Sequence, residues 1–87
     1  MDKVLVVEDD QDIANLIQLH LSELSLQVDH CISGELALKQ FEQQEYALIL
    51  LDVMLPGISG LDVCKQIRLT KPEQTIIMLT SRNTELD

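Results

Sequence analysis

Cationic residues are scarce in this chain of 87 residues, and their scarcity excludes two classes of partner. Six Lys and Arg stand against fifteen Asp and Glu, which gives a formal charge of −9 at pH 7. Binding to nucleic acid or to an anionic membrane draws on cationic side chains that neutralise phosphates, so this charge has the wrong sign for both. We therefore expect no direct contact with nucleic acid or membrane by this segment.

Cysteine, aromatic residues and long apolar runs are also in short supply. Cys31 and Cys64 form no CxxC pair and lie near no histidine spacing typical of zinc sites, so two reduced thiols are expected. Phe41 and Tyr46 are the only side chains that would stack on a flavin. The N-terminus, MDKVLVVEDD, reaches acidic residues after one short apolar run, which fits neither a signal peptide nor a membrane span. We expect a cytoplasmic protein.

What the sequence does contain is enough apolar material for a core. Hydrophobic residues make up 46% of the chain and charged residues 24%, which separates it from disordered sequences. The length fits one domain and leaves no room for two independent cores. We therefore assign residues 1–87 to a single domain.

Apolar runs of strand length alternate with segments of helical periodicity. The expected strands lie at residues 3–7, 26–31, 46–51 and 75–79. The expected helices lie at residues 13–24, 33–41 and 60–69, and SRNTELD after the last strand resembles the first turn of another. Ser33 is the expected N-cap of the second helix. The alternation predicts an α/β fold with a parallel sheet and helices on both faces.

Polar side chains follow three of these strands at the point where each strand ends. Glu8 and Asp9 come directly after the first strand, Asp52 ends the third, and Thr80 follows the fourth. Ligands of open parallel α/β sheets bind outside the carboxyl ends of the strands, so Glu8, Asp9 and Asp52 converge if the first and third strands are neighbours. Three carboxylates packed together repel one another unless a cation intervenes, and hard oxygen ligands in an open site suit Mg²⁺.

Three motifs in this order carry a family resemblance. VLVVEDD, LILLDVMLPGISG and IIMLTS resemble the receiver domain of two-component response regulators, a CheY-like, flavodoxin-like fold with a doubly wound parallel sheet. The segments VVEDD, SGELAL, MLPGISG and LTSRNTELD are most similar to those of transcriptional regulators of the OmpR/PhoB type. The resemblance implies a non-enzymatic signalling module whose partner is a sensor histidine kinase. It also implies that DNA is bound by a separate C-terminal domain.

The resemblance also implies a role for each matching residue. Asp52 is the implied phosphoacceptor, and Thr80 the implied switch hydroxyl. Asp9 and Asp52 would ligate Mg²⁺ directly, Met54 would contribute its backbone carbonyl, and Glu8 would act through a bound water. Phosphoryl transfer needs positioning and charge neutralisation more than covalent help from the protein.

The sequence departs from the family pattern at its end. A receiver domain continues with a fifth strand, which carries a lysine that contacts the phosphoryl group, and with a last helix. The chain therefore resembles an incomplete, C-terminally truncated receiver of order β-α-β-α-β-α-β. We expect phosphorylation to be impaired without that lysine. We also expect the exposed edge of the fourth strand to favour a homo-oligomer or an exchange of elements between copies.

Other interpretations remain for several of these residues. Asp52 taken alone would be a turn or helix cap, and His20 falls on the apolar stripe of the first helix, where a packed histidine is expected. Asp10 and Asp12 have the DxD spacing of a Mg²⁺-dependent phosphatase of the haloacid-dehalogenase type, although they lie late after the first strand. A flavodoxin-like flavin binder is a third interpretation, but the first loop lacks a Ser/Thr/Gly-rich phosphate cradle.

Overall fold

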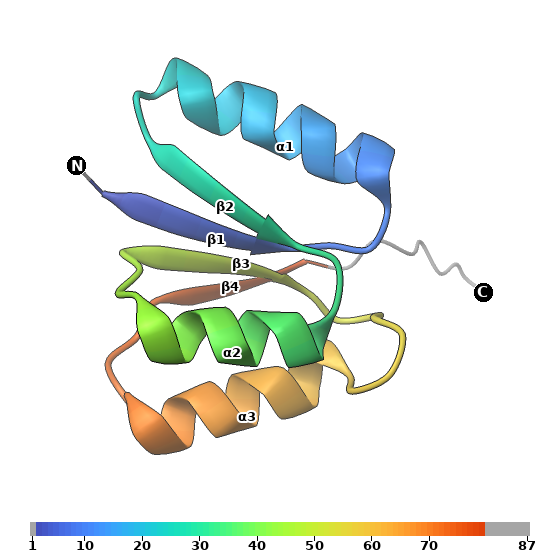
Figure 1. Cartoon of the computed structure of the whole chain (residues 1–87), viewed down its shortest axis with the longest axis vertical. Helices are drawn as coiled ribbons and strands as arrows, with labels where there is room; N and C mark the ends of the chain where they lie inside the picture. The colour runs from blue at the N-terminus through green and yellow to red at the C-terminus, as the bar shows by residue number, and fades with distance from the viewer. Residues whose placement is uncertain (1, 80–87) are drawn as a thin grey trace.

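Strands and helices alternate along the whole described chain (Figure 1). The structure is a computed structural model that describes residues 2–79. The elements are β1 (Lys3–Val7), α1 (Gln11–Glu23), β2 (Gln27–Cys31), α2 (Gly34–Gln43), β3 (Leu48–Asp52), α3 (Gly60–Thr70) and β4 (Ile76–Leu79). All strand pairs are parallel, and the order across the sheet is β2-β1-β3-β4. This confirms the predicted α/β fold and makes β1 and β3 neighbours.

Helices cover both faces of the sheet. Helix α1 lies on one face, and α2 and α3 lie side by side on the other (Figure 1). Strand β1 is interior, and its residues from Val4 to Val7 are at most 1% exposed. Burial on both faces explains why this strand is a continuous apolar run rather than an alternating one. Full burial of each such side chain stabilises the fold by about 1.5–3 kcal/mol.

The main core lies between the sheet and helices α2 and α3. Strands β1 and β3 contribute two large side chains each, and the helices contribute Ala37 and the two aliphatic residues of α3 that face the sheet. The buried members of this core are Leu5, Val7, Cys31, Ala37, Tyr46, Ile49, Leu51, Val63 and Ile67. The core holds the carboxyl ends of β1 and β3 at one edge of the sheet.

Most of the predicted boundaries are correct within two residues. The third strand begins at Leu48 instead of Tyr46, and it includes Asp52 as its last residue. Tyr46 lies before the strand, where its side chain is buried and its hydroxyl donates a hydrogen bond to Asp29 Oδ2 at 2.7 Å. Burial and this bond raise the pKa of Tyr46. Ser33 caps α2 as predicted, because its Oγ accepts a hydrogen bond from Leu36 N–H.

Two predictions about the surface have different outcomes. The packed position predicted for His20 is wrong: its side chain is 67% exposed and its Nδ1 lies 3.7 Å from Glu23 Oε1. The prediction that the fourth strand has an exposed edge agrees with its place at the end of the sheet and with Ile77 on β4, which is 49% exposed. Self-association through that edge stays a prediction. The further helix predicted at 81–87 lies outside the described residues.

The end of α1 contains the one non-glycine residue with a positive φ among residues 2–79. Ser25 has φ 64°, its N–H donates to Ser22 O at 3.0 Å, and the N–H of Leu26 donates to Leu21 O at 3.4 Å. This pair of bonds is a Schellman motif, in which glycine usually occupies the left-handed position. We expect Ser25→Gly to raise the free energy of unfolding by roughly 1 kcal/mol, because it removes the Cβ strain. Urea unfolding measures this gain, and Ser22→Gly in the helix should instead destabilise.

Candidate functional site

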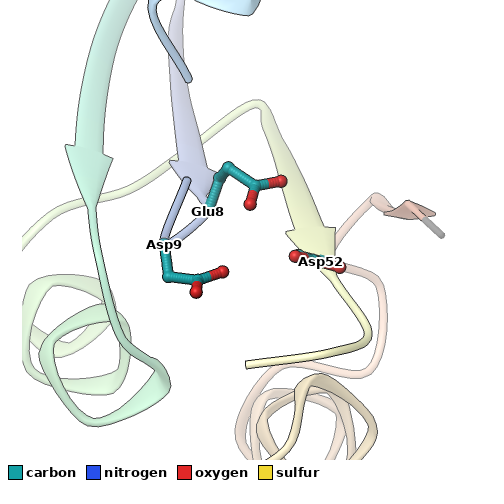
Figure 2. Close-up of side chains that lie close together, drawn as sticks. All are labelled: Glu8, Asp9 and Asp52. Carbon is teal, nitrogen blue, oxygen red and sulfur yellow. The ribbon is translucent and has the colours of Figure 1, made fainter. Parts of the chain in front are cut away.

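Three carboxylates meet at the carboxyl edge of the sheet. Glu8 and Asp9 follow the last residue of β1, and Asp52 is the last residue of β3. Figure 2 shows the Glu8 and Asp9 side chains on one side and Asp52 facing them from the neighbouring strand. One ligand atom of each residue lies within 4.8 Å of the others. The predicted convergence of Glu8, Asp9 and Asp52 is therefore confirmed.

Hydrogen bonds from the backbone fix these side chains. Glu8 and Asp52 are each 1% exposed, whereas Asp9 is exposed to solvent. The N–H of Asp10 donates to Glu8 Oε2 at 3.1 Å, and the N–H of Met54 donates to Asp52 Oδ1 at 3.0 Å. Each bond comes from a residue two positions further along the chain. The turns after β1 and β3 therefore hold the two buried carboxylates in place.

Burial changes the acidity of the site. Desolvation raises the pKa of Glu8 from its ordinary value of 4.5 to about 7, although the hydrogen bond from Asp10 opposes the change. The charges of Asp52 and Asp9 and a hydrogen bond to the Asp52 carboxyl raise it further. Glu8 therefore exchanges its proton near neutral pH, and a cation nearby would favour the ionised form.

The loop after Asp52 returns tightly to its own start. The N–H of Gly60 donates to the carbonyl oxygen of Val53 at 3.0 Å. A Cβ at Gly60 would overlap the carbonyl oxygen of Asp52, and the backbone of Gly57 has φ +73°. A larger residue at Gly60 would therefore displace the strand end, and one at Gly57 would be strained. These two glycines close residues 53–60 into a compact loop beside Asp52.

The other predicted site residues have separate outcomes. The Met54 side chain is 54% exposed and its amide binds Asp52, while the metal-binding role of its carbonyl stays a prediction. Thr80 lies outside the described residues. Asp10 caps α1, since its Oδ1 accepts hydrogen bonds from Asp12 N–H and Ile13 N–H. The Asp10 carboxylate that a phosphatase would use as its nucleophile is thus engaged in capping the helix.

Sequence reasoning missed one residue that supports the site. His30 lies within the strand predicted at residues 26–31, and its Nε2 lies 2.7 Å from the carbonyl oxygen of Glu8. The N–H of Glu8 also donates to Cys31 O at 3.1 Å. Strand β2 thus holds the backbone of Glu8 from the side opposite Asp52. The sequence carries no signal for this contact, because it depends on the register of β2 against β1.

The donor set fits a hard divalent cation. Glu8, Asp9 and Asp52 offer carboxylate oxygens, and Mg²⁺ prefers oxygen ligands with some positions left to water. Glu8 Oε1 is buried, and no hydrogen bond to this atom is found among residues 2–79. A buried carboxylate oxygen of this kind is stabilised by a cation or by a proton. The residues present therefore suit Mg²⁺.

Comparison with known proteins agrees with this geometry. The family model described as the response regulator receiver domain matches residues 4–87. The chain belongs to this family. Among its relatives, the regulatory protein VanR of Enterococcus faecium is 42% identical over 86 residues, or 99% of this chain and 37% of VanR. The transcriptional regulatory protein PhoP of Bacillus subtilis is 44% identical over 85 residues, or 98% of this chain and 35% of PhoP.

Solved structures of receiver domains are similar to this one. The response regulator TrrA of Thermotoga maritima, in complex with Mg²⁺-BeF, has a TM-score of 0.91 and 41% identity, covering 95% of this chain and 72% of TrrA. TrrA in complex with the histidine kinase ThkA has a TM-score of 0.89 and 40% identity. The match covers 97% of this chain and 72% of the matched chain. The receiver fold predicted from the sequence is thus confirmed.

The chain spans little more than a third of the length of the curated relatives named above. Those relatives are transcriptional and regulatory proteins of the OmpR/PhoB type. Among residues 2–79, no helix is long and apolar enough to cross a membrane.

Proposed function

We propose that this receiver domain takes a phosphoryl group onto Asp52 from a phosphohistidine of a sensor histidine kinase. The observation that carries this proposal is the convergence of Asp52 with Glu8 and Asp9 at the strand ends. Asp52 is 1% exposed, and the Met54 N–H binds its Oδ1. These restraints hold the Asp52 carboxylate in one orientation beside the acidic cluster.

In the transfer, a carboxylate oxygen of Asp52 attacks phosphorus as the bond between phosphorus and the histidine nitrogen breaks. The electron pair of that bond returns to the imidazole, and Asp52 becomes an acyl phosphate. Asp52 must be ionised to attack, and the backbone bonds hold it in one orientation. Positioning and charge neutralisation account for the catalysis, since the protein supplies no further covalent chemistry.

Mg²⁺ is the proposed cofactor. Asp9 and Asp52 would hold it directly, Met54 would contribute its carbonyl oxygen, and Glu8 would act through a water. The ion supplies the positive charge that neutralises the transferring group. Glu8 is well placed to bind the ion through a water because its carboxylate is buried beside Asp52 and accepts a hydrogen bond from the Asp10 N–H. The ionised form of Glu8 is the one that would act.

The remaining parts of the proposal concern the response. Thr80 would be the switch hydroxyl that turns toward the phosphoryl group. The domain would act as a cytoplasmic signalling module and not as a turnover enzyme. It would control transcription, because PhoP is named a transcriptional regulatory protein and has a much greater length than this chain. DNA would be bound by a further C-terminal domain of such a protein.

Phosphoramidate labelling tests the proposal without the kinase. The chain is incubated with phosphoramidate and Mg²⁺, and intact mass spectrometry follows the addition of one phosphoryl group. Borohydride reduction then locates the acyl phosphate in peptides. We expect Mg²⁺-dependent labelling at Asp52, which EDTA abolishes because it removes the cation that would balance the acidic cluster.

Two outcomes would contradict the proposal. Labelling at another residue, or equal labelling with and without EDTA, would remove the role of Asp52 or of the metal. Turnover of a chromogenic phosphate ester that Asp10→Asn abolishes and Asp52→Asn preserves would favour the phosphatase alternative.

A further inference from the structure

The first turn of α2 contacts the loop that follows Asp52. Glu35 Oε2 accepts a hydrogen bond from the backbone N–H of Ile58 at 3.1 Å. Figure 1 shows the loop after β3 extending beside the N-terminal end of α2. Hydrogen bonds to an ionised acceptor are stronger than those between neutral groups. The Glu35–Ile58 contact therefore joins the second βα unit to the loop of the third.

Two glycines make room for the Glu35–Ile58 contact. A Cβ at Gly57 would lie 2.7 Å from Glu35 Oε2, closer than packed atoms allow. A Cβ at Gly34 would lie 2.6 Å from Ile58 Cγ2 and 3.2 Å from Ile58 O. Gly34 is buried against the loop, so the helix start and the loop are packed as well as hydrogen-bonded. The hydrogen bond itself is exposed to solvent, but the helix start and the loop on either side of it are closely packed.

The same loop begins directly after Asp52 and contains Met54, whose carbonyl oxygen is proposed to bind the metal. Its start is held by the Met54 N–H on Asp52, and its end by the Gly60 N–H on Val53. Between these two points, the part of the loop that projects from the sheet edge is restrained by Glu35. Because the loop is compact, a change at Ile58 reaches the backbone of Met54 through only a few residues.

We propose that Glu35 is a positioning residue for the phosphorylation site. Its carboxylate holds the loop through Ile58, so that Asp52 and the backbone of Met54 keep one geometry for metal and phosphoryl binding. Glu35 touches neither of these ligands and acts only through the loop. The inference rests on the proposed function of Asp52 and adds to it the residue that orders its loop.

Two variants of Glu35 test the positioning role. Glu35→Ala removes the acceptor, whereas Glu35→Gln keeps an oxygen that accepts the Ile58 N–H. Amide hydrogen exchange by NMR reports the loop, and NMR titration with MgCl₂ reports metal affinity. We expect Glu35→Ala to speed exchange at Ile58 and Met54 and to weaken Mg²⁺ binding by about 10-fold, the range seen for supporting residues of metal sites. Glu35→Gln should restore both toward the wild-type values.

The control is Glu42→Ala, which removes a carboxylate from the last turn of the same helix. We expect it to leave both readouts unchanged. Unchanged exchange at Ile58 in Glu35→Ala, or a Gln variant that behaves like the Ala variant, would overturn the role of Glu35. A wild-type chain that binds no Mg²⁺ would instead overturn the proposed function itself, and with it this inference.

A double-mutant cycle gives an independent measure. Gly57→Ala places a Cβ against Glu35 in the wild-type background, but this collision disappears when Glu35 is already Ala. We expect Gly57→Ala to weaken Mg²⁺ binding by a larger factor in the wild type than in Glu35→Ala, since the two residues are coupled. Equal factors in the two backgrounds would show that Glu35 and Gly57 act independently and would overturn the contact as the cause.

Discussion

Replacement of Asp52 by Asn is expected to abolish phosphorylation by phosphoramidate. An amide is a poor nucleophile toward phosphorus, so the initial labelling rate should fall by at least about 1,000-fold. The fold should survive, because the substitution removes one charge from a cluster of two buried acids and one exposed acid. Intact mass spectrometry after matched incubations measures the rate, and urea unfolding checks that the variant is folded.

Asp2→Asn is the matched control for this variant. Asp2 is exposed and precedes β1, at the opposite edge of the sheet from the acidic cluster. Its substitution removes the same formal charge without touching the site, so labelling should stay at the wild-type rate. Labelling of Asp52→Asn at the wild-type rate would assign the phosphoacceptor to another residue.

Replacement of Glu8 by Gln is expected to stabilise the metal-free protein at and above neutral pH. Burial raises the pKa of Glu8 to about 7 in the folded protein, against an ordinary value of 4.5 that applies to the unfolded chain. The folded state therefore binds more protons than the unfolded state between these pH values. Stability from this group is fully present below pH 4.5 and is lost as the pH rises through 7. The loss amounts to about 3 kcal/mol.

Gln at position 8 resembles the protonated acid and still offers an oxygen to the Asp10 N–H. The variant and the wild type should have similar free energies of unfolding at pH 4.5 and should diverge up to pH 8, with the variant more stable. Urea unfolding in EDTA over this pH range measures the difference. Glu73→Gln, at an exposed position before β4, should follow the wild-type curve. A constant difference at all pH values would contradict the raised pKa.

The acidic site could be predicted from the sequence because its geometry follows from topology. Parallel strands end at one edge of a sheet, so the acids after β1 and at the end of β3 converge once these strands are neighbours. The apolar runs that define the two strands are explicit in the sequence. The family motifs then give roles to Glu8, Asp9 and Asp52, which composition alone does not.

The orientation of α1 could not be predicted in the same way. Apolar residues occur on more than one side of this helix, and the stripe that includes His20, which was predicted to be packed, is not the side that faces the sheet. Ala14 is fully buried, whereas Leu16 and Leu24 are 56% and 68% exposed. The small alanine allows close approach to the sheet, and that rotation places His20 in solvent. Such choices depend on packing between elements, which periodicity within one element does not contain.

The Glu35–Ile58 contact escaped prediction for a related reason. A glutamate in the first turn of a helix is ordinarily explained by the helix dipole, and Glu35 has that position in α2. Its hydrogen bond to the loop depends on how α2 packs against residues of another βα unit. Gly57 marks a turn in the sequence, but its positive φ and the approach of Glu35 to its backbone are seen only in the structure.

The strand order also has a consequence for the folding of the chain. Strand β1 lies between β2 and β3, so its two neighbours come from later parts of the chain. Glu8 and Asp9 therefore meet Asp52 only when β3 pairs with β1, across two helices and a strand that lie between them in the chain. Pairing of this range must overcome the entropy of closing the intervening loop before its contacts stabilise the fold. The repulsion between Asp52 and the two acids after β1 is thus absent from the unfolded chain and arises only when the central strands pair.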